Sequence, residues 1–291
     1  MIILLLSISI VLSTGRNILS KKLSDLRFGT KPFFWCQSVL FLGGAVALLL
    51  FGGIPQSGIA LHTWLYALIY GILLILAQWF YTAALSVGNT ALCSTIYSMG
   101  FILPTLSGAI FWSESISAAG VIGVLCAVSA VVVSGVGKKQ STSDNKKGRG
   151  YLAPLIIAML SSGGLGIIQK LQQRSTYAEQ RSAFLLIAFL IAAGSSLLFA
   201  LISRTPPPSI RMRKVSFAIA ACVGLFFGCC NLLNTYLAGK LDSAVFFPTL
   251  NIGVILLSMG CGMLIFKERL RKKDFAVLLL GIASILLLTV F

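Results

Sequence analysis

Ten apolar runs, each about long enough to cross a lipid bilayer, constrain this chain more than any other feature. About 30 Å of hydrocarbon takes roughly 20 helical residues to span. The runs lie at 2–20, 33–52, 64–86, 91–112, 117–136, 151–169, 183–203, 216–238, 244–266 and 275–291. Lipid offers no water to free peptide groups, so a spanning segment is a helix or part of a closed barrel. Barrel strands alternate polar and apolar residues, and these runs do not. The sequence therefore predicts an all-α integral membrane protein with ten transmembrane helices.

Composition and charge agree with a membrane protein and argue against a nucleic-acid-binding one. Of the 291 residues, 57% are hydrophobic and only 10% are charged, whereas soluble domains carry roughly a quarter charged residues. The formal net charge is +16, but the basic residues fall in short loops between the runs. Anionic lipid headgroups are the expected partner of these charges. All seven cysteines lie in apolar runs without metal-ligand spacing, so we expect them to be packing residues.

The two halves of the chain resemble each other. The triplet STG at 13–15, with Lys-Leu at 22–23, matches SSG at 161–163, with Lys-Leu at 170–171. Coincidence between apolar segments is the alternative interpretation. The predicted organisation is a first five-helix repeat at 1–136, a polar linker at 137–150 and a second five-helix repeat at 151–291. Five is odd, so the second repeat enters the bilayer from the opposite side. Inverted repeats indicate a midplane binding site between the halves and alternating access.

The loop charges predict an orientation. Nineteen of the 23 Lys and Arg residues fall on one side of the predicted spans, and Lys170, Arg174, Arg181 and Lys240 fall on the other. Cytoplasmic loops carry the excess of Lys and Arg. Both termini are therefore expected outside the cell membrane.

Polar residues recur at helical spacing in six of the runs, which places them on one face of each helix. The substrate-binding candidates taken from these stripes are Arg16, Asn17, Gln78, Tyr81, Thr82, Ser94, Tyr97, Ser98, Asn231, Asn234 and Asn251. Polar side chains are costly in hydrocarbon and usually face the bundle interior or a watery cavity. A central polar cavity is the hypothesis. Simple hydrogen bonding between neighbouring helices, worth about 0.6 kcal/mol on average, is the alternative for any single residue.

Arg16 is the one cation predicted inside an apolar run. It lies about one and a half turns before Lys21, so its side chain could reach the headgroups. It could equally present a guanidinium fork to a carboxylate or phosphate, because Arg suits bidentate recognition of such groups. The sequence leaves both interpretations open.

The fourth run carries a predicted hinge and ends in an acid. Pro104 has no N–H, so the carbonyl of Gly100 loses its helical partner and the helix is free to kink or unwind there. A kink that serves packing alone is the alternative. Glu114 follows the run and is expected to be an exposed helix-end charge. The other acids also lie in loops or at span ends, and His62 is the only histidine. The sequence therefore predicts no catalytic site, metal site or cofactor.

The segment NTALCSTIYSMGFILPTLSGAIFWSES at 89–115, followed by a helix with Gly120 and Gly123, resembles EamA-type members of the drug/metabolite transporter superfamily. The family's mid-span proline and following glutamate match Pro104 and Glu114. The resemblance implies that helices one, three, four, six, eight and nine line the substrate path, the same six that carry polar stripes. Two features depart from the family. Its members usually keep both termini in the cytoplasm, and the related small multidrug resistance proteins use a glutamate in helix one, where this chain has Arg16.

These observations predict a secondary transporter or facilitator of the cell (inner) membrane for a small neutral, zwitterionic or anionic metabolite, such as an amino acid. A flippase for a lipid-linked precursor is the first alternative, and a non-transporting membrane scaffold is the second. The expected partners are the small-molecule substrate and a bilayer with anionic headgroups, with a homodimer left open. No nucleic acid or cofactor is expected.

Overall fold

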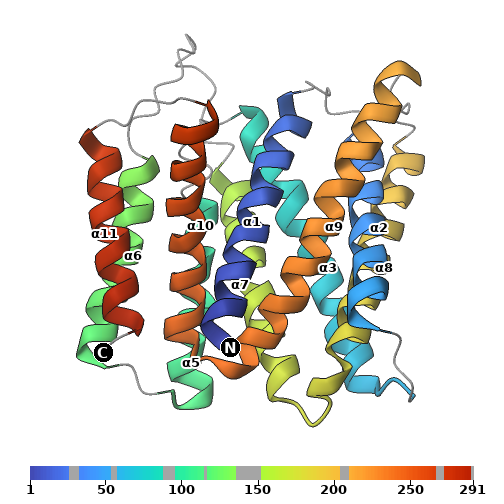
Figure 1. Cartoon of the computed structure of the whole chain (residues 1–291). Coiled ribbons are helices and arrows are strands. Elements are labelled where there is room, and N and C mark those ends of the chain that lie inside the picture. Colours follow the sequence, from blue (N-terminus) through green and yellow to red (C-terminus); the bar gives the residue numbers. More distant parts are fainter. Residues whose placement is uncertain are drawn as a thin grey trace. The chain divides into compact units, whose positions relative to one another are not determined.

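The structure is a computed structural model that describes residues 1–25, 33–53, 58–87, 96–114, 117–135, 152–203, 210–266 and 272–289. In these residues the chain forms ten α-helices, two short 3-10 helices and no strand (Figure 1). The elements are α1 (Ile2–Asp25), α2 (Phe33–Gly52), α3 (Leu61–Val87), η1 (Met99–Phe101), α5 (Ile102–Trp112), α6 (Ala118–Gly135), α7 (Leu152–Arg174), η3 (Ala178–Gln180), α8 (Arg181–Ile202), α9 (Ile210–Lys240), α10 (Ser243–Phe266) and α11 (Lys272–Thr289).

Every predicted run coincides with a helix, so the all-α fold class is confirmed. Seven described helices are long and apolar enough to span a membrane, and three shorter apolar helices accompany them. The helix boundaries differ most from the prediction where polar residues flank an apolar run. Helix α7 continues to Arg174, five residues beyond the predicted end, and α9 begins at Ile210 instead of 216. Gln, Lys and Arg are good helix formers, so these helices extend into the polar residues beside the apolar run.

The helices gather into two compact units that each combine segments from both halves of the sequence. Unit 1 comprises Met1–Ile75 and Ile168–Gly239, and unit 2 comprises Leu76–Ile167 and Lys240–Phe291. Unit 1 therefore holds α1, α2, α8, α9, the first part of α3 and the last part of α7. Unit 2 holds the remaining parts of α3 and α7 with α5, α6, α10 and α11.

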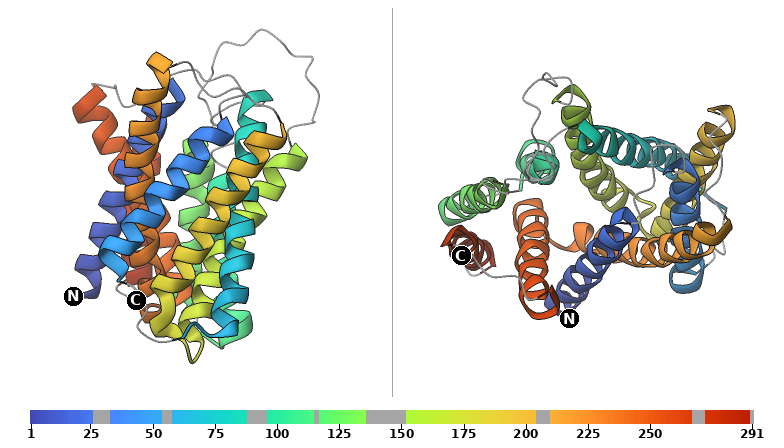
Figure 2. Two further views of the ribbon diagram at one scale, coloured as in Figure 1. Left: turned by 90° about the vertical axis from the view of Figure 1, so that its right-hand side faces the viewer. Right: turned by 90° about the horizontal axis from the view of Figure 1, so that it is seen from above.

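Close backbone contact between α2 and α9 organises unit 1. A side chain on Gly224 would place its Cβ 2.0 Å from the carbonyl oxygen of Leu40, and one on Gly228 would place it 2.4 Å from that of Gly44. Only glycine fits such crossings. Gly224 and Gly228 therefore allow α9 to pack closely against α2 of the same chain. Helix α8 lies beside α2 (Figure 2).

Three phenylalanines fill the space between these helices of unit 1. The Phe189 ring lies 5.9 Å from the Phe41 ring and 5.3 Å from the Phe227 ring, measured between centroids. All three rings are buried. They join α2, α8 and α9 through an aromatic core, which fixes the position of Phe227.

In unit 2, α6 lies beside α11, and α10 packs against α5, α6 and α11 (Figures 1 and 2). A Cβ on Gly123 of α6 would lie 2.8 Å from Leu288 of α11. Small residues again let the helices approach closely. Polar groups are fewer in this packing than in the interior of unit 1.

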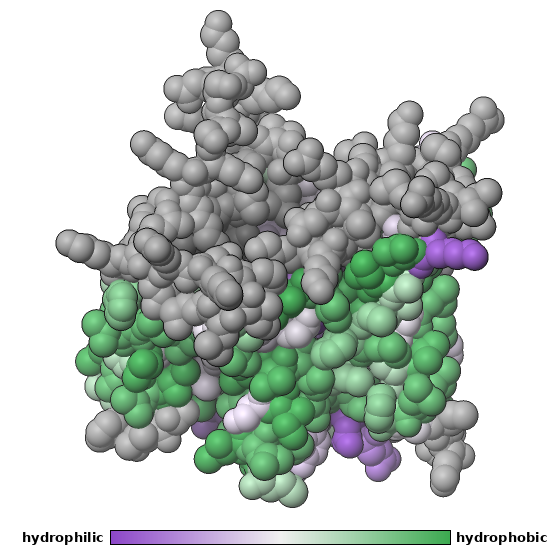
Figure 3. Space-filling model, turned by 45° about the horizontal axis from the view of Figure 1, so that its top comes forward, coloured by the Kyte–Doolittle hydropathy of each residue, from purple (hydrophilic) through white to green (hydrophobic). Residues whose placement is uncertain are grey.

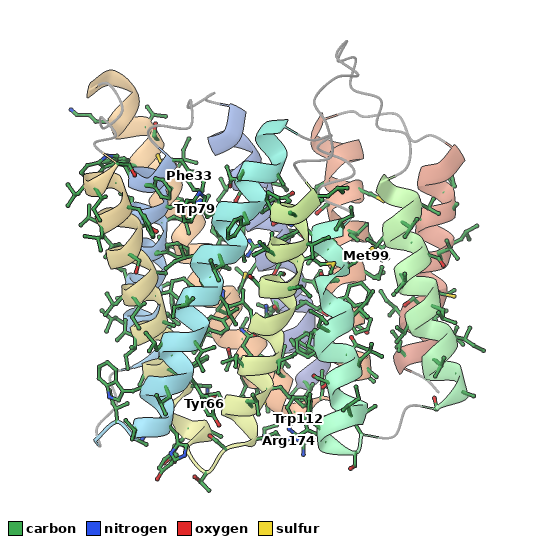
Figure 4. All side chains as sticks on the ribbon, turned by 180° about the vertical axis from the view of Figure 1, so that it is seen from behind. Phe33, Tyr66, Trp79, Met99, Trp112 and Arg174 are labelled. Atoms are coloured by element: carbon green, nitrogen blue, oxygen red, sulfur yellow. The ribbon has the colours of Figure 1, made fainter. Side chains whose placement is uncertain are left out.

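The outer surfaces suit a lipid environment. Figure 3 shows apolar side chains over the sides of the helices, with hydrophilic side chains toward their ends. Figure 4 places Tyr66 and Arg174 of unit 1 near one end of their helices and Phe33 near the other. In unit 2 it places Trp79 and Trp112 near opposite ends. Trp and Tyr concentrate at membrane–water interfaces, so this is the distribution of a multi-pass membrane protein.

Candidate functional site

Helices α1 and α9 of unit 1 run antiparallel and meet along a polar seam (Figure 1). Ser9 Oγ donates a hydrogen bond to Asn234 Oδ1. Farther along α1, Ser13 Oγ donates to Cys230 Sγ at 3.5 Å. Next comes Arg16, whose guanidinium lies over the ring of Phe227. Rising numbers on α1 meet falling numbers on α9, which brings the polar stripes of both helices face to face.

Arg16 lies four residues before the end of the α1 span at Ser20, and its half-buried side chain extends over α9. Its guanidinium carbon is 4.8 Å from the centre of the Phe227 ring. The α9 span runs from Lys214 to Lys240, so Phe227 is thirteen residues, or about 20 Å of helix, from either basic end. The side chain of Arg16 is directed toward this midpoint. That direction favours the second interpretation of Arg16, recognition of an anionic group, over contact with the headgroups.

Within the described part of the chain, Arg16 has one hydrogen-bond acceptor and no carboxylate partner. Nη2 donates to Asn17 Oδ1 at 3.1 Å, and Asn17 itself is exposed. A guanidinium carries five N–H donors. Most of the donors of Arg16 are therefore available to a ligand or to water.

A buried hydrogen-bond cluster lies one helical turn along α9 from Phe227. Tyr70 Oη donates to Asn231 Oδ1 at 2.5 Å, and Gln169 Nε2 lies within hydrogen-bond distance of Tyr70 Oη (2.9 Å) and Asn231 Oδ1 (3.2 Å). Asn231 Nδ2 donates to the carbonyl of Phe227 at 2.9 Å. The cluster joins α3, α7 and α9. It also holds the backbone of Phe227, the residue whose ring lies under the Arg16 guanidinium.

Asn231 is the only residue of this cluster that was predicted for the site. Gln169 could also have been selected, because it is a polar residue within the apolar run at 151–169. Tyr70 was missed, although it precedes Tyr81 by eleven residues, three turns of helix, and so shares its face. Its low exposure of 1% and its two amide partners come from tertiary packing.

Two buried threonine hydroxyls of unit 1 lack a hydrogen-bond partner in the described structure. They are Thr14 Oγ1 on α1 and Thr235 Oγ1 on α9. Thr82 and Thr105 instead bond the carbonyl four residues back, of Gln78 (2.8 Å) and Phe101 (2.8 Å), whereas Thr249 of α10 in unit 2 is also unpaired. Buried polar groups are usually paired. Unpaired hydroxyls on α1 and α9 indicate that these helices carry hydrogen-bonding capacity that their packing does not use.

The prediction for Lys170 was wrong. It was expected in a loop on the outer side, but it lies within α7 in unit 1 and is 1% exposed. The apolar run ends before it, while the helix continues for a further turn. A buried ionisable residue in a membrane protein is a functional candidate by default, because its burial is costly. Unit 1 thus holds a second cation within its helices.

The other candidates that the structure describes lie in unit 2. The rings of Tyr81 and Tyr97 pack with their centroids 4.3 Å apart, which brings the end of α3 together with the start of the fourth span. Asn251 Nδ2 donates to the carbonyl of Phe247 at 2.9 Å, a bond within α10. Gln78, Thr82 and Ser98 are half-buried. Ser94 lies outside the described residues.

The predicted hinge coincides with a change in helix type. The 3-10 turn η1 covers Gly100, and α5 begins directly after it with Pro104 in its first turn. A Cβ on Gly163 of α7 would lie 2.6 Å from the Gly100 carbonyl oxygen, so two glycines let the backbones touch here. Whether this segment moves stays a prediction.

Glu114 corrects a second prediction, because it is buried instead of solvated, at 9% exposure. Helix α5 ends at Trp112, and the capping residue Ser113 has a left-handed φ of 52°. This turn directs Glu114 back toward α10, where Oε2 accepts the backbone N–H of Ser243 at 2.7 Å. A carboxylate at a helix N-terminus satisfies a free donor and the helix dipole. Glu114 thus joins α5 to α10.

The chemistry available among the described residues is that of binding. They contain no group of three or more His, Cys, Asp or Glu placed to hold a metal ion. The polar side chains are amides, hydroxyls and cations, set along helices that carry apolar outer faces. Such groups recognise a polar solute within a membrane protein.

A family match comes from the second half of the chain. Residues 149–290 match the model of the EamA-like transporter family. The match covers 142 of the 291 residues, just under half of the chain. It agrees with the EamA-type resemblance noted for residues 89–115, which lie outside the matched segment, and the EamA-like match indicates a membrane transporter.

Solved structures resemble this chain at the level of fold. Twenty-eight chains match. One, titled "Crystal structure of protein", has a TM-score of 0.77 and 16% sequence identity, covering 99% of this chain and 96% of its own. No curated protein matches the chain. The likeness covers essentially the whole chain and supports the fold alone.

Proposed function

We propose that this EamA-like protein is a secondary transporter or facilitator, and not an enzyme. Its substrate is a small neutral, zwitterionic or anionic metabolite, such as an amino acid, that crosses the cell (inner) membrane by alternating access between two inverted repeats. Both termini face outward in this proposal. The observation that carries it is the α1–α9 seam, where Ser9 bonds Asn234 and the Arg16 guanidinium lies over Phe227. The buried cluster around Asn231 lies one turn away on α9.

The seam supports a solute path because its polar groups exceed what packing requires. Helix pairs in membranes associate well through small residues alone, as α2 and α9 do at Gly224. A charged guanidinium adds cost and no packing advantage. Its presence, with unpaired Thr14 and Thr235, is explained by a polar solute that spends part of the cycle beside α1 and α9.

The substrate class also follows from what these helices lack. Cation exporters of the small multidrug resistance type use a carboxylate in helix one. Here α1 carries Arg16 and no acid before Asp25, its last residue, and α9 contains no acid. A lipophilic cation would be repelled along the seam, whereas a carboxylate or a dipolar solute would be attracted.

Uptake by liposomes that contain the purified protein tests the proposal. The labelled panel holds amino acids, organic anions and one lipophilic cation, with and without a pH gradient, and empty liposomes are the control. We expect uptake of an amino acid or an organic anion. Uptake of the cation alone would contradict the proposed substrate class, and no uptake of any compound would contradict metabolite transport.

A further inference from the structure

We propose that Arg16 is the recognition site for an oxyanion, the carboxylate or phosphate of the ligand that this protein carries. The inference deepens the proposed function and depends on it for the word transport, but not for the binding step. It rests on three observations in unit 1: the aromatic platform, the unpaired donors and the charge balance.

The platform fixes where the guanidinium points. Phe227 is buried against Phe41 and Phe189, with centroid distances of 6.4 and 5.3 Å. Its own carbonyl accepts Asn231 Nδ2. The ring therefore has little freedom, and a guanidinium 4.8 Å above it is oriented by a rigid surface. The ring offers no hydrogen-bond acceptor beyond its π face, so the N–H groups of the fork that point away from it are available to a ligand.

The donors of this fork are mostly unused. Arg16 makes one hydrogen bond, to its neighbour Asn17, in the described structure. A carboxylate or phosphate oxygen pair matches the fork geometry and makes two parallel charge-assisted bonds. An amide or hydroxyl ligand would satisfy one donor and leave the charge uncompensated. The geometry thus favours an anion over a neutral solute.

The charge balance of unit 1 also favours an anionic ligand. Its two segments contain twelve Lys and Arg residues and two acids, Asp25 and Glu179. Glu179 is exposed in η3, at the start of the candidate span Ala178–Ile202. Asp25 is nine residues from Arg16, about 14 Å along α1. Among the described side chains no carboxylate pairs with Arg16, whose acceptor is Asn17. The excess of cations in unit 1 therefore favours an anionic ligand.

Two sources could present this chemistry, a soluble metabolite or a lipid headgroup, and binding measurements separate them. The protein is placed in nanodiscs of phosphatidylcholine, with or without phosphatidylglycerol, and its thermal unfolding midpoint is measured. The soluble probes are glutamate, succinate and inorganic phosphate, with glutamine and succinamide as neutral counterparts. A ligand that binds the native state raises the midpoint by mass action.

The variants are Arg16→Gln, Arg16→Lys and a matched control, Arg181→Gln. Arg181 also lies over an α9 ring, 5.1 Å from the centre of Tyr236. We expect an oxyanion probe to raise the midpoint of the wild type and of Arg181→Gln. Arg16→Gln should bind it about 10- to 100-fold more weakly, the loss typical of a charge-assisted pair. Arg16→Lys should fall between them, because it keeps the charge and loses the fork.

Each outcome decides the proposal. A midpoint shift that needs Arg16 only when phosphatidylglycerol is present assigns the oxyanion to the lipid, and a shift with soluble probes assigns it to a metabolite. Either supports Arg16 as the site. The proposal is overturned if Arg16→Gln keeps the shift, if neutral counterparts shift the midpoint equally, or if neither soluble oxyanions nor phosphatidylglycerol shift it.

Failure of this inference is distinguishable from failure of the proposed function. Liposomes that take up a neutral metabolite equally well with wild type and Arg16→Gln would leave transport standing and remove Arg16. Oxyanion binding that requires Arg16, without uptake of any soluble compound, would do the reverse. A folded Arg16→Gln is recognised by an unchanged midpoint without ligand, and Arg16→Lys serves if Arg16→Gln does not fold.

Discussion

Two arginines of unit 1 lie over rings of the same helix, yet their surroundings differ. Arg16 lies over Phe227 at the middle of the α9 span, and Arg181 lies over Tyr236, four residues from its end at Lys240. Near a helix end, water and headgroups can reach most N–H groups of a guanidinium, although Nε of Arg181 itself is buried without a partner among the described residues. At the midpoint, a ligand or a watery path has to supply these partners. The contrast teaches that depth along α9, and not the arginine–ring contact, indicates function.

The largest loss of stability and activity should come from disrupting the crossing of α2 with α9, the helix that carries Phe227 and Tyr236. Gly224→Val would place side-chain atoms within 2.0 Å of the Leu40 carbonyl oxygen. We expect α2 and α9 to separate, with a loss of about 3 kcal/mol or more of stability and loss of all activity. Gly194→Ala in α8 is the control, because its Cβ would meet no atom within 4 Å. Thermal unfolding and gel filtration measure the outcome; equal stability of the two variants would refute the crossing.

A second change tests the seam without disturbing that frame. Asn234→Leu removes the acceptor of Ser9 on α1 and lies between Phe227 and Tyr236 on α9. We expect uptake into liposomes to be abolished while insertion and folding persist, because leucine is well tolerated in a membrane helix. Ser7→Ala is the control, since Ser7 Oγ bonds only the carbonyl of Ile3 on its own helix. Normal transport by Asn234→Leu would move the site elsewhere.

A smaller effect is expected one turn from Phe227. Tyr70→Phe removes the hydroxyl that lies between Gln169 and Asn231. The loss should lower stability by about 1–3 kcal/mol, because buried polar partners are left unsatisfied. If the cluster also positions Phe227, the KM for an anionic substrate should rise severalfold. Denaturation and uptake kinetics separate the two effects, and a variant identical to wild type in both would show that the cluster positions nothing.

The smallest effect should come from the second arginine. Arg181→Gln removes a cation–ring contact worth about 0.5–1 kcal/mol, together with a buried Nε that has no hydrogen-bond partner in the described structure. We expect a slight fall in the unfolding midpoint and an unchanged KM. A loss of transport equal to that of Arg16→Gln would remove the distinction between the middle and the end of α9.

The helices could be predicted from the sequence because a long apolar run is itself the signal of a membrane-spanning helix. Helical periodicity also predicted that Arg16, Asn231 and Asn234 lie on polar faces of their helices, while their role in substrate binding stays a prediction. Lys170 was placed in a loop, because hydropathy ends with the apolar run while α7 continues. Tyr70 and Glu114 were not predictable in the same way. Tyr70 acquires its role from α7 and α9, and Glu114 from the N-terminus of α10, distant in sequence and adjacent only in the fold.

The repeat organisation stays a prediction, and the hinge at Gly100 and Pro104 stays one as well. Both concern how parts of the molecule move or relate by symmetry. Each compact unit contains segments of both halves, so the halves are not separate domains in space. The glycine pair Gly100 and Gly163 shows that backbone contact accompanies the 3-10 turn.

The decisive measurement compares KM for a transported acid with KM for its neutral amide, in wild type and in Arg16→Gln, using uptake into liposomes. If Arg16 binds the oxyanion during transport, the substitution should raise KM for the acid about 10-fold or more and leave the amide unchanged. Equal changes for both compounds, or none for either, would contradict recognition of the substrate by Arg16.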